Sequence, residues 1–348
     1  MSNSIGRNLV FTSFGESHGP ATGGILDGCP AGIKLDYDLI NSDLRRRSPI
    51  GKKATTSRVE ADQCEFLSGI LDGVTLGTPI AYLIRNTDVK SSDYDDLKEV
   101  FRPGHADHTW AAKFGIRDHR GGGRASARET VARVVAGAIA KMLLAASNIS
   151  VEAFVTSVAG ITVESDPASF SGKISASNPI SCPDQKIAGL MLSEVEKNHK
   201  SGDSTGGVIT CVVQNVQAGI GSPVFNKLHA SLAYANLSIP AAKGFELGAG
   251  FENSKLKGSE LNDSLLKPNI SAASLGGING GISNGGIIWF RVAFRPAASI
   301  AMEQKAYNSE GKMVSLKIRG RHDSFFLPRA VPVVEAMTAL TIADYLSY

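Results

Sequence analysis

One stretch of the chain combines glycine and arginine in a way that could bind an anion. Residues 121–123 are three consecutive glycines, and the apolar side chains of residues 129–146 repeat at helical spacing. Ser126 and Glu129 fit the S-x-x-E capping box, so we expect Ser126 to cap this helix. Free backbone N–H groups at a helix start attract phosphate or carboxylate. Four arginines crowd the same end: Arg120, Arg124, Arg128 and Arg133.

Positive charges at a helix N-terminus are unfavourable because they oppose the helix dipole. Four arginines at this end therefore favour a site in which an anion lies between them. The alternative is a glycine turn and a capped helix whose arginines face solvent. A Walker loop is excluded, because the chain has no G-x-x-x-x-G-K-[ST] pattern. The glycines of residues 276–286 precede a β-type segment rather than a helix, so they do not form a dinucleotide-binding fingerprint.

Basic residues recur in other turns and at one helix end. Arg47 falls on the apolar face of the helix predicted over residues 36–47, although a cation at a helix C-terminus needs no ligand. Residues 101–108 and 319–323 are further basic turns, and residues 295–299 form a small basic turn that alone is typical of an ordinary loop. Guanidinium groups bind carboxylates and phosphates through paired hydrogen bonds, so the pattern fits a substrate that carries both.

Three ionisable residues stand in unusual surroundings. His18 and His105 lie in glycine-flanked turns, where a histidine is more often a surface or capping group than a catalyst. Asp344 lies one turn beyond Leu340 on the apolar stripe of the last predicted helix, so its carboxylate must be paired or perform chemistry. No metal site is predicted, because His105 and His108 lack cysteine or carboxylate partners at ligand spacing.

Composition limits the class of protein. The 348 residues are 43% hydrophobic and 20% charged, which excludes a disordered chain or a coiled coil. The net charge of +3 does not indicate a nucleic-acid-binding surface. The most apolar stretch is interrupted by Arg133 and Lys141, so no membrane span is predicted. Four widely spaced cysteines and the lack of a signal-peptide pattern indicate a cytoplasmic protein with reduced thiols.

Periodicity predicts an α+β protein with antiparallel strands, built as a single domain over residues 1–348. Strands are expected over residues 8–13, 75–85, 151–163, 207–216 and 287–294. Helices are expected over residues 36–47, with Asp36 as N-cap, and over 129–146, 184–199, 223–237 and 332–346. Pro332 is expected in the first turn of the last helix.

Four motifs along nearly the whole chain resemble the chorismate synthase family. They are G-E-S-H-G at 15–19, R-P-G-H-A-D at 102–107, G-G-G-R-A-S-A-R-E-T at 121–130, and G-R-H-D at 320–323 followed by P-R-A-V-P-V-V-E-A-M at 328–337. The resemblance implies that 5-enolpyruvylshikimate 3-phosphate loses phosphate and a ring proton in a 1,4-anti elimination that gives chorismate. It also implies a need for reduced FMN, a sandwich of antiparallel sheets around long helices, and a homotetramer.

The resemblance also assigns roles to the unusual residues. His18 lies near the reduced flavin in this interpretation, and His105 donates a proton to the departing phosphate. Asp344 lies beside flavin N5, where the ring proton is taken. Ser17 and Ser126 support the proton transfers with their hydroxyl groups.

The remaining site residues implied by the resemblance hold anions or the flavin. The role of holding the anionic groups of the substrate or of FMN is assigned to Arg47, Lys53, Arg102, Arg128, Arg133 and Arg321. Flavin contacts are assigned to Arg124, Ala125, Ser126, Pro240, Ala241, Gly280, Arg295, Pro296, Ala297, Ala298, Ser299 and Arg321. Lys53 replaces a guanidinium of many relatives, and Pro240 replaces an asparagine. Reduction of the flavin by NADPH on this chain, or by an external flavin reductase, is left open.

Two other classes of protein compete with this interpretation. A flavoenzyme with net hydride transfer would need a nicotinamide site, and the missing dinucleotide fingerprint counts against it. An RNA- or phosphoinositide-binding module would need a basic surface with exposed aromatic residues, whereas the arginines here fall in glycine turns and only 7% of residues are aromatic.

Overall fold

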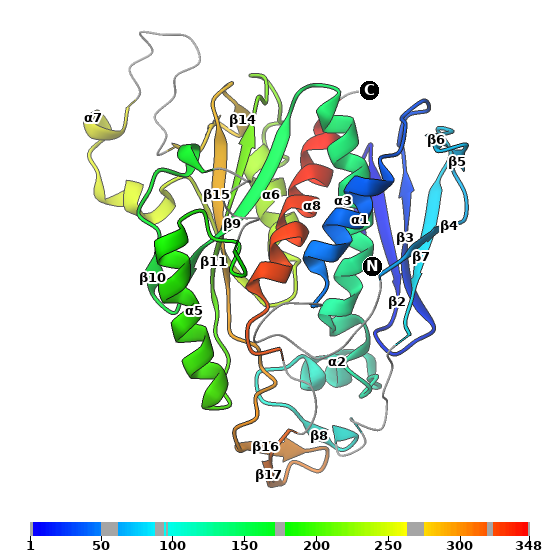
Figure 1. Cartoon of the computed structure of the whole chain (residues 1–348), viewed down its shortest axis with the longest axis vertical. Helices are drawn as coiled ribbons and strands as arrows, with labels where there is room; N and C mark the ends of the chain where they lie inside the picture. The colour runs from blue at the N-terminus through cyan, green and yellow to red at the C-terminus, as the bar shows by residue number, and fades with distance from the viewer. Residues whose placement is uncertain are drawn as a thin grey trace.

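The structure is a computed structural model that describes residues 3–49, 62–87, 94, 97–170, 178–262, 275–318 and 323–346. In this part of the chain, two five-stranded antiparallel sheets form the outer layers and long helices lie between them (Figure 1). The prediction of an α+β sandwich of antiparallel sheets around central helices is confirmed.

The two large sheets come from different halves of the chain. The first has the order β1 (Ser4–Ile5), β2 (Val10–Gly15), β3 (Ala21–Asp27), β7 (Ile80–Arg85) and β4 (Cys64–Phe66). The second has the order β10 (Ile161–Thr162), β9 (Ser150–Val158), β11 (Gly207–Gln214), β15 (Ile288–Phe294) and β12 (Ala242–Leu247). Shorter strands are β5 (Ile70–Leu71), β6 (Val74–Thr75), β8 (Val100–Phe101), β13 (Ile278–Asn279), β14 (Ile282–Ser283), β16 (Gln304–Asn308) and β17 (Met313–Leu316).

The helices divide into a central group and a peripheral one. The central helices are α1 (Tyr37–Arg47), α3 (Thr130–Ala145), α6 (Leu228–Leu237) and α8 (Leu327–Tyr345). The others are α2 (Asp107–Phe114), α5 (Gln185–Lys200) and α7 (Gly258–Leu261), with 3-10 turns η2 (Gly123–Ala125), η3 (Ala127–Glu129), η4 (Pro167–Ser169) and η5 (Gly250–Lys255). No helix in the described ranges combines the length and the apolar character needed to cross a bilayer.

Helices α3 and α8 form the centre of the core, and both are apolar around nearly their whole circumference. Such helices are stable only when neighbours cover every face. They approach most closely at Gly137, where an added Cβ would collide with the Cα and Cβ of Ala336. Glycine is therefore required at this position by packing, and the close approach fixes where α3 begins beside the site described below.

Four charged residues, Asp43, Arg46, Lys141 and Glu335, join the central helices next to this contact. Glu335 of α8 accepts hydrogen bonds of 2.6 Å from Arg46 of α1 and from Lys141 of α3. Asp43 pairs with the same two cations at 2.9 and 2.7 Å. Because each buried carboxylate has two cationic partners, the cluster orients the three helices without leaving an unpaired charge.

Several boundaries differ from the sequence predictions for local reasons. The strand expected over 151–163 is two strands, because Ala159 and Gly160 adopt positive φ values of 49° and 85° and reverse the chain. The last helix begins at Leu327, so Pro332 lies inside it and Pro328 occupies the first turn instead. The helix expected from residue 223 begins at Leu228. Asp36 caps α1 as predicted, accepting a hydrogen bond from the Leu39 amide.

Candidate active site

The glycine stretch 121–123 is a tight turn that packs against the turn after β2. All three glycines have positive φ, between 52° and 86°. A Cβ at Gly121 would collide with the His18 ring, so only glycine lets the two turns meet. The Ser17 hydroxyl lies 3.1 Å from Nδ1 of His18 and 3.4 Å from the Arg120 carbonyl oxygen. The predicted association of Ser17 and His18 with this turn is therefore present in the structure.

His105 approaches the same turn from the other side. A Cβ at Gly122 would lie 3.0 Å from Cε1 and 3.3 Å from Nε2 of His105. Nδ1 of this histidine lies 2.9 Å from Oδ1 of Asp107 and 3.0 Å from Nη2 of Arg102. Burial lowers the pKa of His105, and its hydrogen bond to Asp107 opposes that effect without cancelling it. The glycine turn thus brings His18 and His105, 87 positions apart in the sequence, to neighbouring faces of one loop.

The basic turn after β15 also reaches this region. A Cβ at Gly104 would lie 3.4 Å from Nη1 of Arg295 and 3.8 Å from Cβ of Ala298. The Arg295 amide donates to the carbonyl of Ala241 at 3.0 Å, which places the turn containing Pro240 beside residues 295–299. The carbonyl of Ala297 accepts a hydrogen bond from Ser204. Most of the predicted flavin contacts therefore lie near His105.

Arg47 and Arg128 converge on one buried carboxylate, that of Asp62. Nη1 of Arg47 lies 3.1 Å from Oδ2 of Asp62, and Nη1 of Arg128 is hydrogen bonded to Oδ1. All three side chains are at most 4% exposed. Burial raises the pKa of Asp62, but the charges of Arg47 and Arg128 outweigh it and hold that pKa below its ordinary value. Burial lowers the pKa of Arg47 to about 10, opposed by Asp62 and reinforced by Arg329 and Arg128.

Three of the arginines at the start of α3 each contact a different protein group, so the anion site expected from their spacing stays a prediction. Arg120 pairs with Asp118 at 2.9 Å, and Arg124 donates to the Ser13 hydroxyl at 2.6 Å. Arg133 pairs with Glu129 at 2.9 Å. Ser126 caps the 3-10 turn η3 and accepts a hydrogen bond from the Arg128 amide, so the predicted cap of α3 lies one short turn earlier than the helix itself.

Asp344 lies apart from His18 and His105. Its Oδ1 accepts hydrogen bonds from the amides of Arg7 and Asn8 at 2.7 Å and from that of Leu9 at 2.9 Å. It lines a separate cavity of about 340 Å³ with Phe225. The apolar stripe predicted that this carboxylate is either paired or performs chemistry, and the structure shows it paired with the chain before β2, while its role beside a flavin stays a prediction.

Two predicted site residues, Lys53 and Arg321, lie outside the described residues. Gly280 belongs to the β13–β14 hairpin with φ of 61°, and no described atom lies within 4 Å of where its Cβ would be. Arg133 and Arg124 both line a small cavity of about 90 Å³, and Arg124 also lines the larger cavity beside His105. For these residues the proposed binding roles stay predictions.

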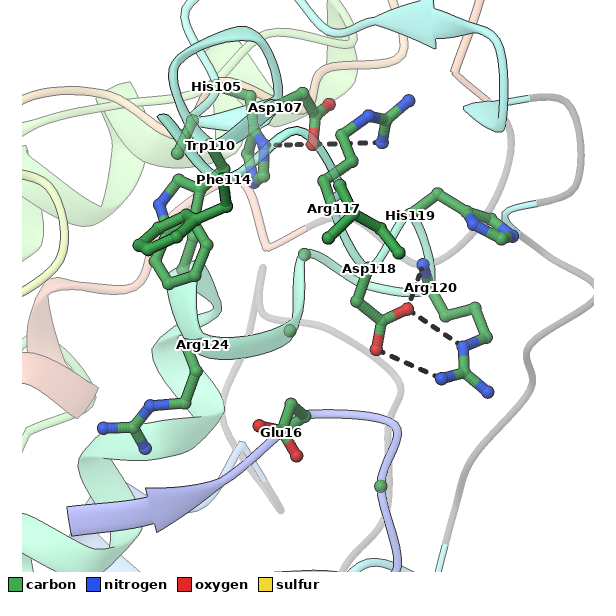
Figure 2. A pocket seen from close by; sticks show the side chains of 16 residues that line it. Glu16, His105, Asp107, Trp110, Phe114, Arg117, Asp118, His119, Arg120 and Arg124 are labelled. Carbon is green, nitrogen blue, oxygen red and sulfur yellow. Dashed lines mark hydrogen bonds and ion pairs between the residues drawn. The ribbon is translucent and has the colours of Figure 1, made fainter. Parts of the chain in front are cut away.

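A cavity of about 780 Å³ opens beside His105 and the glycine turn (Figure 2). Trp110 and Phe114 of α2, with ring centroids 5.1 Å apart, form an apolar wall, while Arg124 and Ala125 line the cavity next to the glycine turn. A planar ring system can lie against such a wall, and a phosphate tail needs the cationic and backbone N–H groups that the turn offers. The residues present therefore fit a flavin mononucleotide.

Two acidic residues of this region, Asp107 and Asp323, were not assigned roles from the sequence. Asp107 could have been found, since it ends the R-P-G-H-A-D motif two positions after His105. Asp323 could also have been found, as the last residue of G-R-H-D. It pairs with Arg329, which in turn donates to the Arg47 carbonyl at 3.0 Å. Among the described residues, Oδ1 of Asp323 is buried without a hydrogen-bond partner.

Comparisons with known proteins agree with this site. The chain matches the family described as chorismate synthase over residues 9–346. It is 49% identical over 344 residues to the chorismate synthase of Christiangramia forsetii, covering 99% of this chain and 97% of that one, and 50% identical over 348 residues to that of Parabacteroides distasonis, with the same coverage. A crystal structure of chorismate synthase superimposes with a TM-score of 0.75 at 31% identity, over 98% of this chain and 92% of that chain. The chain therefore belongs to the chorismate synthase family.

Proposed function

We propose that the chain is a carbon–oxygen lyase that eliminates phosphate from 5-enolpyruvylshikimate 3-phosphate to give chorismate, the last step of the shikimate pathway. The carbon–oxygen bond to phosphate breaks, a ring carbon–hydrogen bond breaks, and a new double bond forms, so the reaction has no net redox change. The observation that carries the proposal is the meeting of His18, His105 and the glycine turn 121–123 beside buried arginines.

The geometry favours His105 as the proton donor to phosphate. Its Nε2 edge faces the glycine turn, while Arg102 and Arg295 lie beside it as cations for the leaving group. A departing phosphate gains negative charge as the bond breaks, and a positioned acid and fixed guanidinium groups stabilise that charge. His18, held by Ser17 on the neighbouring face of the turn, would hold or pass a second proton.

Reduced FMN is the cofactor that we propose for the cavity beside α2. Trp110 and Phe114 would cover its ring, and Arg124, Ala125, Ser126 and the turn 295–299 would hold its polar groups. When bound, reduced FMN would supply transient electron density to the substrate during carbon–oxygen cleavage. The chain's own residues exclude water from one face of the ring and hold the two anionic ligands together.

The acceptor of the ring proton is better assigned to Asp323 than to Asp344. Oδ1 of Asp344 already accepts three backbone hydrogen bonds, and this residue lines a different cavity from His105. Asp323 has a buried oxygen with no partner in the described part of the chain and is linked through Arg329 to Arg47. Asp323→Asn should abolish most of the single-turnover rate while Asp344→Asn retains it; the reverse order would restore the assignment to Asp344.

A single-turnover assay of phosphate release tests the assignment of His105. His105→Ala should slow phosphate release by about two to four orders of magnitude, which is the usual contribution of a general acid. His229→Ala is a control, since His229 lies on α6 outside the cavity. Normal phosphate release by His105→Ala would reject the proposed role.

Three features of the proposal go beyond the site. We propose a homotetramer, a location in the cytoplasm and a supply of reduced flavin either from NADPH on this chain or from an external flavin reductase. The support for assembly is exposed apolar surface on the second sheet's side, where Phe251 is 78% exposed beside Trp289 and Phe245. Light scattering of the purified protein would measure the oligomeric state directly.

A further inference from the structure

We propose that Asp107 is a positioning residue that holds the His105 imidazole and selects the ring nitrogen that faces the reacting phosphate. This inference rests on the proposed role of His105 as a proton donor. Asp107 is the first residue of α2, and its side chain is 2% exposed. It lies two positions after His105, so the start of α2 turns its carboxylate back towards the imidazole (Figure 2).

Contacts with Arg102 fix the orientation of the Asp107 carboxylate independently of the histidine. Arg102 donates from Nε to Oδ2 at 2.8 Å and from Nη2 to Oδ1 at 3.0 Å, and its backbone amide donates to Oδ2 at 3.2 Å. Nη1 of Arg117 lies 3.5 Å from Oδ1. A planar fork of this kind allows one orientation of the carboxylate, so Oδ1 has a defined position 2.9 Å from Nδ1 of His105.

Nδ1 of His105 therefore faces one group that only accepts and another that only donates. The Asp107 carboxylate can only accept, while Nη2 of Arg102, 3.0 Å away, can only donate. A protonated Nδ1 can donate only to Asp107, and an unprotonated Nδ1 can accept only from Arg102. The imidazolium form carries protons on both nitrogens, so it is compatible with this site only through Asp107.

The opposite edge of the ring is held by the glycine turn. Gly122 leaves space where a Cβ would lie 3.0 Å from Cε1 and 3.3 Å from Nε2 of His105. When Nδ1–H is bound to Asp107, the second proton of the imidazolium form is on Nε2 and points towards this turn and the cavity. Asp107 thus places the transferable proton on the nitrogen that faces the phosphate, in the way a carboxylate orients histidine in hydrolytic triads.

Arginines surround His105, so the protonated form of its imidazole depends on the negative charge of Asp107. Arg102 lies on the same turn, Arg295 approaches from the turn after β15, and Arg117 lies behind Asp107. The other charged or titratable side chains that line the cavity are Glu16, Asp118, His119, Arg120 and Arg124, of which Asp118 and Arg120 pair with each other. Removing the Asp107 charge leaves the imidazole facing arginines, which disfavours the imidazolium form.

The pH dependence of Asp107→Asn tests the inference. We expect the single-turnover rate at neutral pH to fall at least tenfold, within the range of a general acid's contribution, and the alkaline limb to move to lower pH. Substrate affinity should change less than the rate. Asp184→Asn is the matched control, because Asp184 caps α5 and does not line the cavity. A single-turnover rate that falls by the same factor at all pH values, with the alkaline limb at its wild-type position, would overturn the inference.

Ring ¹⁵N shifts of His105 in the wild-type protein give a second test that needs neither a variant nor activity. The signal is assigned by its loss in His105→Gln. We expect Nδ1 to stay protonated as the pH falls and Nε2 to take up the second proton. A neutral form with Nε2 protonated and Nδ1 bare would contradict the inference. If the wild-type protein forms no chorismate but shows the expected shifts, the proposed function fails while the geometry of Asp107 stands.

Discussion

Replacing Asp62 by asparagine tests whether the two arginines are held as an anion-binding pair. Asp62 is the shared partner of Arg47 and Arg128, and the three side chains are 2%, 4% and 3% exposed. The substitution keeps the side chain's shape but removes the charge between two buried cations. Arg329 adds a third positive charge that already lowers the pKa of Arg47. We therefore expect a loss of stability and a gain in affinity for added anions.

The expected loss of stability is about 3–5 kcal/mol, the usual consequence of removing one partner from a buried ion pair. The direction in which the stabilisation by Asp62 changes with pH also follows from the structure. Because the native pKa of Asp62 is lowered, its stabilisation is present above about pH 4, its unfolded value, and is lost as pH falls through the native pKa. The variant should therefore differ most from wild type near neutral pH and least in acid.

Urea unfolding with and without inorganic phosphate measures both effects. Phosphate at about 100 times its dissociation constant should restore up to about 2.7 kcal/mol to the variant, because it binds only the native state. Glu252→Gln is the matched control, since Glu252 and Lys255 form an ion pair with both side chains about two-thirds exposed, and it should change little.

A stability of Asp62→Asn within about 1 kcal/mol of wild type would refute the reasoning, because it would mean that the buried charges are not coupled. Destabilisation without any greater response to phosphate would confirm the ion pair but reject the view that the arginines form an anion site.

Three further predictions follow from single contacts. Arg128→Lys should weaken binding of the phosphorylated substrate, because a lysine cannot form the paired hydrogen bonds of a guanidinium; calorimetric titration measures the dissociation constant, and an unchanged value would contradict the substrate role. Gly137→Ala should destabilise the protein by about 1–3 kcal/mol through overpacking against Ala336, whereas Gly189→Ala, with open space at its Cβ, should not; equal stabilities would contradict the packing argument. Asp344→Asn should lower the melting temperature and retain the single-turnover rate, because its carboxylate holds the amides of residues 7–9. A normal melting curve together with a slow chemical step would contradict this structural role.

Interactions between residues close in sequence could be predicted well. The glycine turn 121–123, the histidine turns and the cap at Asp36 are local patterns, and the structure contains each of them. The fold beyond its α+β class came from the resemblance of motifs, because strand order depends on contacts that periodicity does not encode. Apolar periodicity located α3 and α8, but their close approach at Gly137 depends on Ala336, 199 positions away.

Partners that are distant in sequence explain what could not be predicted. Asp62 is separated from Arg128 by 66 positions, and nothing in either segment indicates the pairing. The apolar stripe left open whether Asp344 is paired or performs chemistry, and only the family resemblance implied a place beside the flavin; its hydrogen-bond partners lie more than 330 positions earlier. The arginines at the start of α3 were expected to hold an anion, and their spacing gave no sign of protein partners such as Ser13, which lies 111 positions before Arg124.

The most direct test of the central claim is an anaerobic reaction with the wild-type protein, the enolpyruvyl substrate and chemically reduced FMN. Chorismate absorbance, free phosphate and the oxidation state of the flavin are followed together. We expect one phosphate for each chorismate, no net flavin oxidation and no turnover when flavin is omitted. Phosphate release without flavin would indicate a phosphatase, and stoichiometric flavin oxidation would indicate an oxidoreductase; either result would contradict the assignment as a lyase.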